Sequence, residues 1–156
     1  MFYDDSAEIS RIRSGKERIV MVEMQLRRMI VNERPCNGQL IVLGEKGGDR
    51  ELNVLIGQHE IMMLKVSVDQ VSHPRPMTHD LLTNVITGLG AEVVRLEIRE
   101  LREATFFGTL VLNKGGKEIE IDCRPSDALV ICKLNDVHQV FVEEAVLEEA
   151  GTIRQK

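Results

Sequence analysis

Two strand–turn–strand units constrain the fold of this chain more than any other feature. EKGGD separates the apolar run over residues 39–43 from the run over 51–56, and NKGGK separates 106–112 from 118–122. Short strand-like runs joined by Gly-Gly turns are typical of β-hairpins, because glycine readily adopts the positive φ that tight turns need. The sequence therefore predicts a sheet in which neighbouring strands run antiparallel.

Spacing of apolar residues predicts the other elements. Residues 19–31, 94–98 and 139–142 indicate further strands, and residues 58–71, 78–90, 125–135 and 143–150 indicate helices. The second helix is expected to turn its apolar residues inward: Leu81, Leu82, Val85, Ile86 and Leu89. Hairpins and helices without regular βαβ spacing predict an α+β fold, with helices packed on one side of a mostly antiparallel sheet built of hairpins.

The length of 156 residues suits one domain of ordinary size. Residues 1–18 are polar and lack sustained periodicity, so they are expected to form a flexible N-terminal arm. The domain is expected over residues 19–151, followed by a short tail over 152–156. Because the first strand is long, apolar and rich in methionine, we also expect a homo-oligomer.

Composition narrows the function. Twenty basic and 25 acidic residues give a net charge of -5, whereas proteins that bind nucleic acid non-specifically are usually basic, so any nucleic-acid site must be a local patch. No leader pattern or apolar run of membrane-spanning length is visible, so a cytoplasmic location without membrane contact is expected. The cysteines Cys36, Cys123 and Cys132 lack paired spacing and are expected to be reduced thiols.

Two segments stand out, RPMTHDL at 75–81 and DCRPSDA at 122–128. Their order and separation resemble the bifunctional nuclease family, which is defined by the BFN domain and carries an RP-x-THDL segment followed by an acidic-x-RPSDA segment about 45 residues later. The likeness extends to Ile56-Gly57 with Glu60, and it covers residues 19–151. Cys123 departs from it, because alanine is usual at that position. The resemblance implies a nuclease that acts on DNA and RNA.

Phosphodiester hydrolysis needs an activated water, positive charge on the phosphoryl oxygens and help for the leaving group. Both motifs open helices, whose N-termini attract phosphate, so the Asp80 and Asp127 side chains are expected to share one depression near Arg124. The candidate catalytic residues are His79, Asp80 and Asp127, and the candidate phosphate-binding residues are Arg75, Thr78, Arg124 and Ser126. Asp80 and Asp127 could also hold Mg²⁺ or Mn²⁺. No organic cofactor is expected.

A structural interpretation of the same residues competes with the catalytic one. Thr78, Asp80, Ser126 and Asp127 are also residue types that begin stable helices, with Thr78 standing at the N-cap. Glu60 fits a solvated helix face. The alternative function is a non-catalytic regulatory domain that binds an anion or a partner at these helix starts. His79 is harder to explain structurally, because a cation at a helix N-terminus opposes the helix dipole.

Overall fold

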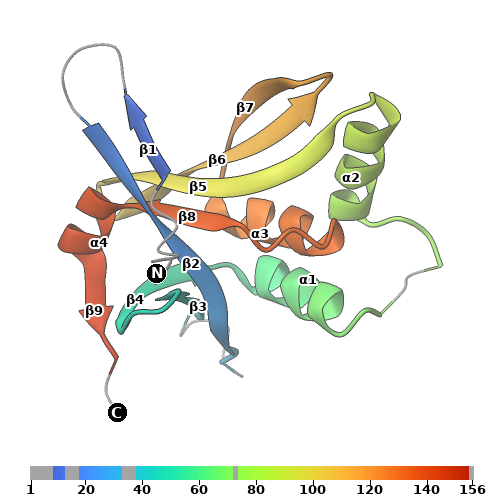
Figure 1. Cartoon of the computed structure of the whole chain (residues 1–156). Helices are drawn as coiled ribbons and strands as arrows, with labels where there is room; N and C mark the ends of the chain where they lie inside the picture. Colours follow the sequence, from blue (N-terminus) through green and yellow to red (C-terminus); the bar gives the residue numbers. More distant parts are fainter. Residues whose placement is uncertain (1–8, 13–17, 33–37, 72–73, 155–156) are drawn as a thin grey trace, which may run out of the picture.

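The protein is described by a computed structural model over residues 9–12, 18–32, 38–71 and 74–154 (Figure 1). These residues form one sheet and four helices. The strands are β1 (Ile9–Ile12), β2 (Arg18–Ile30), β3 (Gln39–Glu45), β4 (Arg50–Ile56), β5 (Glu92–Arg102), β6 (Thr105–Lys114), β7 (Lys117–Cys123), β8 (Val140–Glu143) and β9 (Gly151–Ile153). The helices are α1 (Gln58–Val68), α2 (Thr78–Gly88), α3 (Pro125–Leu134) and α4 (Glu144–Ala150).

The sheet is mostly antiparallel, as the sequence predicts. Its strand order is β7-β6-β5-β8-β2-β3-β4-β9, with β1 paired to β2. Among the described pairs, only β5 and β8 run parallel. Both predicted hairpins form, as β3–β4 and β6–β7. The turn glycines Gly47, Gly115 and Gly116 have positive φ, which explains why glycine stands there.

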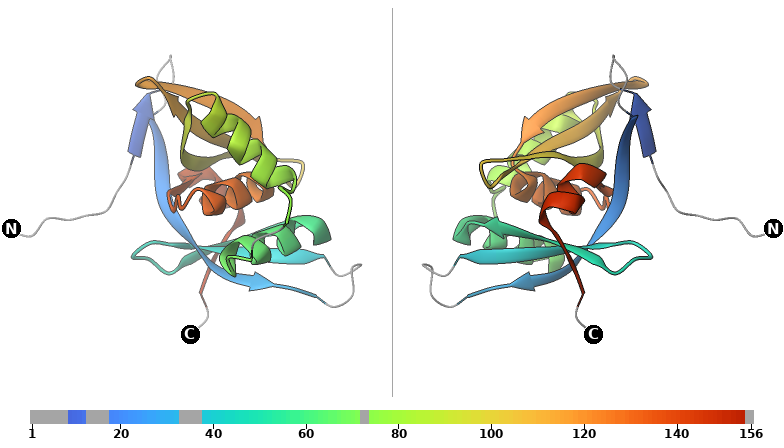
Figure 2. Two further views of the ribbon diagram at one scale, coloured as in Figure 1. Left: turned by 90° about the vertical axis from the view of Figure 1, so that its right-hand side faces the viewer. Right: turned by 90° about the vertical axis from the view of Figure 1, so that its left-hand side faces the viewer.

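The curved sheet folds around α3, which lies near the centre of the molecule (Figure 2). Helix α3 contacts β5, β6, α1 and α2, and seven of its ten residues are buried. Leucine, isoleucine, valine and methionine side chains from the sheet and from α1 complete one core around it. Helices α2 and α4 lie at opposite ends of the molecule (Figure 1).

The chain ends differ from the sequence prediction. Residues 9–12 of the expected arm form β1, which pairs with β2, while residues 1–8 and 13–17 lie outside the described residues. Thr152 and Ile153 of the expected tail belong to β9 and pair with β4. Helix α1 ends at Val68 rather than at Val71, because Gln70 has a positive φ and cannot continue the helix.

Helix α2 is oriented opposite to the prediction. Leu81, Leu82, Val85 and Leu89 are exposed, and of the five residues expected inward only Ile86 packs against the core. The helix contacts α3 through its more polar side, where Asn135 Nδ2 donates to Thr83 Oγ1 at 3.3 Å. The assignment was wrong because periodicity identifies an apolar face but not the surface that covers it.

Strand β2 buries the residues that suggested an oligomer. Met21, Val22 and Met24 are at most 8% exposed, because neighbouring strands and the core cover them. The homo-oligomer expected from the sequence therefore needs another surface.

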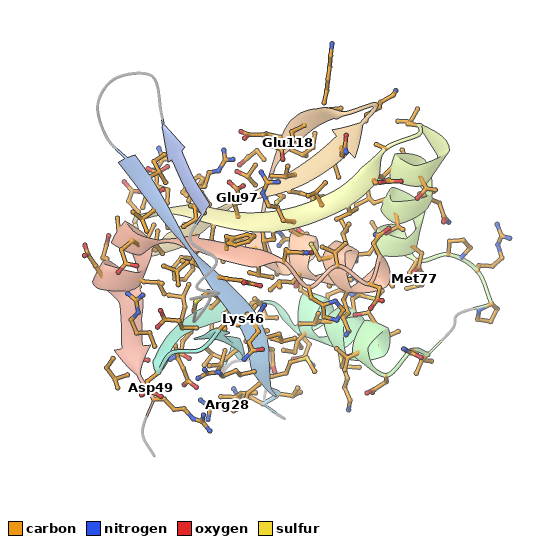
Figure 3. The ribbon with its side chains drawn as sticks, in the orientation of Figure 1. Arg28, Lys46, Asp49, Met77, Glu97 and Glu118 are labelled. Carbon is orange, nitrogen blue, oxygen red and sulfur yellow. The ribbon has the colours of Figure 1, made fainter. Side chains whose placement is uncertain are left out.

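An ion-pair network covers the face of β5 opposite the core. Leu96 and Ile98 enter the core, while Glu97 accepts hydrogen bonds from Arg95 and Arg99 at 2.6 and 2.7 Å. The two arginines also form bidentate pairs with Glu118 and Glu120 on β7. Figure 3 shows Glu97 and Glu118 on these strands. The network ties the edge hairpin β6–β7 to the centre of the sheet.

No helix in the described part of the chain is long and apolar enough to cross a membrane.

Candidate functional site

The first element of the site is the start of α2, which Asp80 caps. The N-cap is Met77, labelled in Figure 3, rather than the expected Thr78, which is the first helical residue and is exposed. Asp80 Oδ2 accepts a hydrogen bond from the Met77 backbone N–H at 2.9 Å. One carboxylate oxygen of Asp80 is therefore engaged at the start of its own helix, as the structural interpretation expects.

His79 links the two sequence motifs. Its side chain is 6% exposed, and its Nε2 lies 3.0 Å from Oδ1 of Asp127 in the first turn of α3. The two residues are 48 positions apart in the chain. His79 is therefore the residue through which the first motif meets the second, and Asp80 points elsewhere. This contact also explains a histidine at a helix start, because its ring interacts with a carboxylate of another helix.

Arg124 extends the contact to a third helix. Its Nε donates to Asp127 Oδ2 at 2.8 Å, and its Nη2 lies 2.8 Å from Oε1 of Glu60 in the first turn of α1. Glu60, His79, Arg124 and Asp127 thus form a continuous group, which we call the helix-start cluster. The Arg124 side chain remains 66% exposed, so its guanidinium group is open to an incoming anion.

The hydrogen bonds assign a tautomer to His79. An ionised Asp127 carboxylate can only accept hydrogen bonds, so His79 Nε2 must carry the proton in this contact. In the neutral ring, Nδ1 then holds a lone pair. Within the described residues this nitrogen is buried and has no hydrogen-bond partner. Nδ1 is consequently the ring nitrogen of His79 that no hydrogen bond among the described residues occupies.

Asp127 and Arg124 each favour the ionised form of the other. Partial burial acts to raise the pKa of the Asp127 carboxyl group, but hydrogen bonds from Arg124 and His79 outweigh burial, and the pKa lies below its ordinary value. The hydrogen bond and charge of Asp127, with a smaller effect of Glu60, raise the pKa of Arg124. At neutral pH the site therefore holds an ionised carboxylate beside a guanidinium cation.

The lowered pKa predicts a pH-dependent contribution of Asp127 to stability. A carboxyl group with a depressed pKa in the folded state stabilises the protein above its unfolded pKa, ordinarily 3.8, and loses that effect as pH falls through the folded value. The difference in unfolding free energy between wild type and Asp127→Asn should shrink as pH falls below about 4. Denaturant titrations of both proteins from about pH 5 to about pH 3 measure it. A difference that grows over this range would contradict the assignment.

The other predicted site residues do not all join the cluster. Asp80 lines a separate hollow of about 250 Å³ between α1 and α2, together with Pro76 and Leu134. Arg75 is exposed in the segment before α2, and Ser126 is buried in the first turn of α3. Asp80 and Asp127 therefore do not share the depression that the sequence predicted. The two motifs meet instead through the contact between His79 and Asp127.

The donor set does not match a preformed metal site. Across the described ranges, no three His, Cys, Asp or Glu side chains gather in a way that could hold a metal ion. Both oxygens of Asp127 accept hydrogen bonds, and one oxygen of Asp80 accepts one from Met77. The described residues therefore do not form a preassembled Mg²⁺ or Mn²⁺ site, and ligation by Asp80 and Asp127 stays a prediction.

Glu60 is the cluster member that sequence reasoning assigned to a solvated face. Its side chain is 13% exposed and binds Arg124. Its position in the sequence could have indicated this contact. Gly57 is the N-cap of α1, and Glu60 stands three residues later, where its carboxylate reaches back over the helix start. A methyl group at Gly57 would collide with that carboxylate, so the glycine leaves room for it.

The two described cysteines are poor nucleophiles. Burial raises the pKa of Cys123 to about 11 and that of Cys132 to about 12. Both thiols are free and stay protonated at neutral pH. Cys36 lies outside the described residues.

Comparison with known proteins defines the family of this chain. The model of the bifunctional nuclease domain matches residues 41–155, and the chain belongs to this family. An uncharacterized protein of Mycobacterium tuberculosis strain H37Rv is 37% identical over 121 residues, which cover 78% of this chain and 71% of the relative. Its counterpart in strain CDC 1551 matches equally well.

More distant relatives carry a functional name. Bifunctional nuclease 1 of Oryza sativa subsp. japonica is 24% identical over 132 residues, which cover 81% of this chain and 40% of the rice protein. The bifunctional nuclease of Oryza minuta has the same identity and coverage. The chain therefore spans less than half the length of these named nucleases.

Proposed function

We propose that the protein hydrolyses phosphodiester bonds of DNA and RNA at the helix-start cluster. The observation that carries the proposal is the contact of His79 with Asp127 and Arg124, which joins the two motifs at the starts of α2 and α3. Family membership and the named rice relatives support the same reaction class. The cytoplasmic location predicted from the sequence is part of this proposal.

Each side chain has a defined role in this mechanism. Arg124 is the exposed cation and would bind a non-bridging phosphoryl oxygen. Asp127 holds Arg124 and the ring of His79 in position through its two oxygens. Arg75, exposed ahead of α2, would contact a neighbouring phosphate of the same strand. The cluster therefore supplies one phosphate-binding cation and one positioned base.

The base would be His79 Nδ1. As a water oxygen attacks phosphorus, the water proton passes to Nδ1, the phosphorus–oxygen bond to the leaving group breaks, and a solvent water protonates the departing oxygen. Asp127 stabilises the resulting imidazolium through its bond to Nε2. Because the His79 side chain is 6% exposed, this mechanism requires the start of α2 to shift outward when substrate binds.

Arg124→Gln tests the phosphate-binding role. Cleavage of single-stranded DNA and RNA should fall at least tenfold, because one charge-assisted contact to the phosphate is lost. The melting temperature should change little, because the side chain is mostly exposed. Arg154→Gln is the matched control, since Arg154 is an exposed arginine near the C-terminus.

Contamination and metal dependence are controlled in the same experiment. Wild type and both variants are purified in parallel and assayed with and without a chelator, at low and at physiological salt. Because the net charge is -5, substrate binding should weaken steeply as salt rises. Equal cleavage by all three preparations would show a contaminating nuclease and defeat the proposal.

One observation favours a non-catalytic alternative. Every charged member of the helix-start cluster has a partner inside the cluster, and the base is nearly buried. Such a cluster could simply tie three helices together and leave Arg124 to bind an anion or a partner carboxylate. Salt-sensitive binding of a labelled oligonucleotide without cleavage, lost in Arg124→Gln, would select this function.

A further inference from the structure

Helix α2 presents an uncovered apolar face to solvent. Leu81, Leu82, Val85 and Leu89 are exposed by 57%, 43%, 47% and 64%. Met77, at the N-cap, is exposed by a further 39%. Single exposed leucines are ordinary on protein surfaces, but three such neighbours on α2 and a fourth at its C-cap, extended by a methionine, form a contiguous patch.

Helical geometry separates this face from the side that is docked. At about 100° per residue, Leu81, Leu82, Val85 and Leu89 fall within an arc of about 100°. His79, Thr83 and Ile86 fall on a separate, neighbouring arc of about 60°, and these are the residues that meet α3 and the core. The helix is therefore amphipathic but docks through its more polar side. Its most apolar face stays exposed to solvent within one chain, so the free energy of burying that face is not gained there.

We propose that this face binds the same face of a second copy of the chain, with the two α2 helices antiparallel across a two-fold axis near Val85. The proposal is independent of any nuclease activity, because it rests on the outer side of α2. It also gives the homo-oligomer expected from the sequence a surface that β2 does not provide.

The stripe is self-complementary in the antiparallel orientation. Leu81, Val85 and Leu89 are spaced four residues apart, so a two-fold axis at Val85 places Leu81 opposite Leu89 of the partner subunit. None of the residues in the stripe carries a charge, so no like charges meet at the axis, although each chain has a net charge of -5. A neutral patch is the surface on which two such chains can approach.

The ends of the helix favour the same orientation. Exposed Arg75 precedes α2, and exposed Glu92 follows it. An antiparallel partner brings the arginine end of one helix toward the glutamate end of the other, and it also opposes the two helix dipoles. A parallel partner would bring like charges together. Charge complementarity therefore selects the antiparallel second copy.

The size of the patch is sufficient for the core of such an interface. Its side chains expose several hundred Å² of mostly apolar surface, on the order of the about 800 Å² per partner in a standard interface. Monomeric proteins seldom leave a patch of that extent uncovered unless it has a function. The segment before α2 and the start of β5 would supply the polar rim.

Sedimentation equilibrium of the full chain tests the proposal. Wild type should have twice the chain mass of 17.6 kDa at micromolar concentration. Val85→Glu and Val85→Lys should each be monomeric, because each places two like charges beside the axis. Their equimolar mixture should recover the dimer, because opposite charges then face each other. Circular dichroism checks that both variants are folded, which is expected since Val85 is half exposed.

Leu55→Glu is the matched control. Leu55 is 68% exposed on β4, so its replacement adds the same charge at an apolar surface position remote from α2. This control should remain dimeric. A monomeric wild type, a dimer that persists in both Val85 variants, an equal effect of Leu55→Glu, or a mixture that stays monomeric would each overturn the proposal.

Discussion

Asp127→Asn is expected to reduce phosphodiester cleavage about a hundredfold or more while the protein stays folded. The amide can still accept a hydrogen bond from His79, but its NH₂ group cannot accept one from Arg124 Nε, and it carries no charge to stabilise an imidazolium. The phosphate-binding cation and the base are therefore both weakened by one substitution. Because the Asp127 side chain is only partly buried, the loss of unfolding free energy should stay within about 1–2 kcal/mol.

Two further Asp→Asn variants serve as controls for the effect of Asp127→Asn on cleavage. Asp136→Asn changes the same charge at a side chain that is 93% exposed, so its activity should equal that of wild type. Asp80→Asn keeps an oxygen for the Met77 N–H, so it should also retain activity if Asp80 is only a cap. Initial cleavage rates and melting temperatures of the four proteins decide the matter. A hundredfold loss in Asp80→Asn would return Asp80 to the catalytic set, and full activity in Asp127→Asn would reject the mechanism.

Glu97→Ala is expected to cause the largest loss of stability. Glu97 is 2% exposed and lies between the guanidinium groups of Arg95 and Arg99. Removing it leaves the buried Arg95 with Glu118 as its remaining carboxylate partner, and breaking a buried pair in this way typically costs up to about 3–5 kcal/mol. For a domain of this size the melting temperature should fall by about 10 °C or more.

Glu100→Ala separates burial from simple loss of an ion pair. Glu100 lies on the same strand and pairs with Arg102 at 3.4 Å, but both side chains are more than half exposed. Its replacement should cost less than about 1 kcal/mol. Equal melting temperatures for the two variants would show that the network around Glu97 does not hold the β6–β7 hairpin to the sheet.

The antiparallel sheet could be predicted from the sequence because hairpins are local. Alternating apolar residues and a Gly-Gly turn lie within a few positions of one another, so residues 39–56 and 106–122 carry the information for their own pairing. The helix starts were visible for the same reason. Where an observed helix end differs from the predicted one, as at Val68 of α1, the two lie within a few residues of each other.

The site could be predicted only as a set of residue types. Asp80 and Asp127 both stand in the first turn of a helix and are indistinguishable in sequence, yet Asp80 caps α2 while Asp127 binds His79 and Arg124. Which of them turns toward the other motif depends on how α2 lies against α3. Glu60 was assigned to a solvated face because its partner, Arg124, is 64 positions away.

The sequence by itself determined the α+β class, the two motifs and the described elements other than β1 and β9, because each of these depends on residues close together in the chain. The tertiary structure decided which side of α2 is covered and which carboxylate meets His79. Both depend on packing between helices distant in sequence, and hydrophobic periodicity specifies a face without naming its neighbour. The exposed stripe centred on Val85 is therefore visible only after the chain has folded, as a face that α3 leaves uncovered.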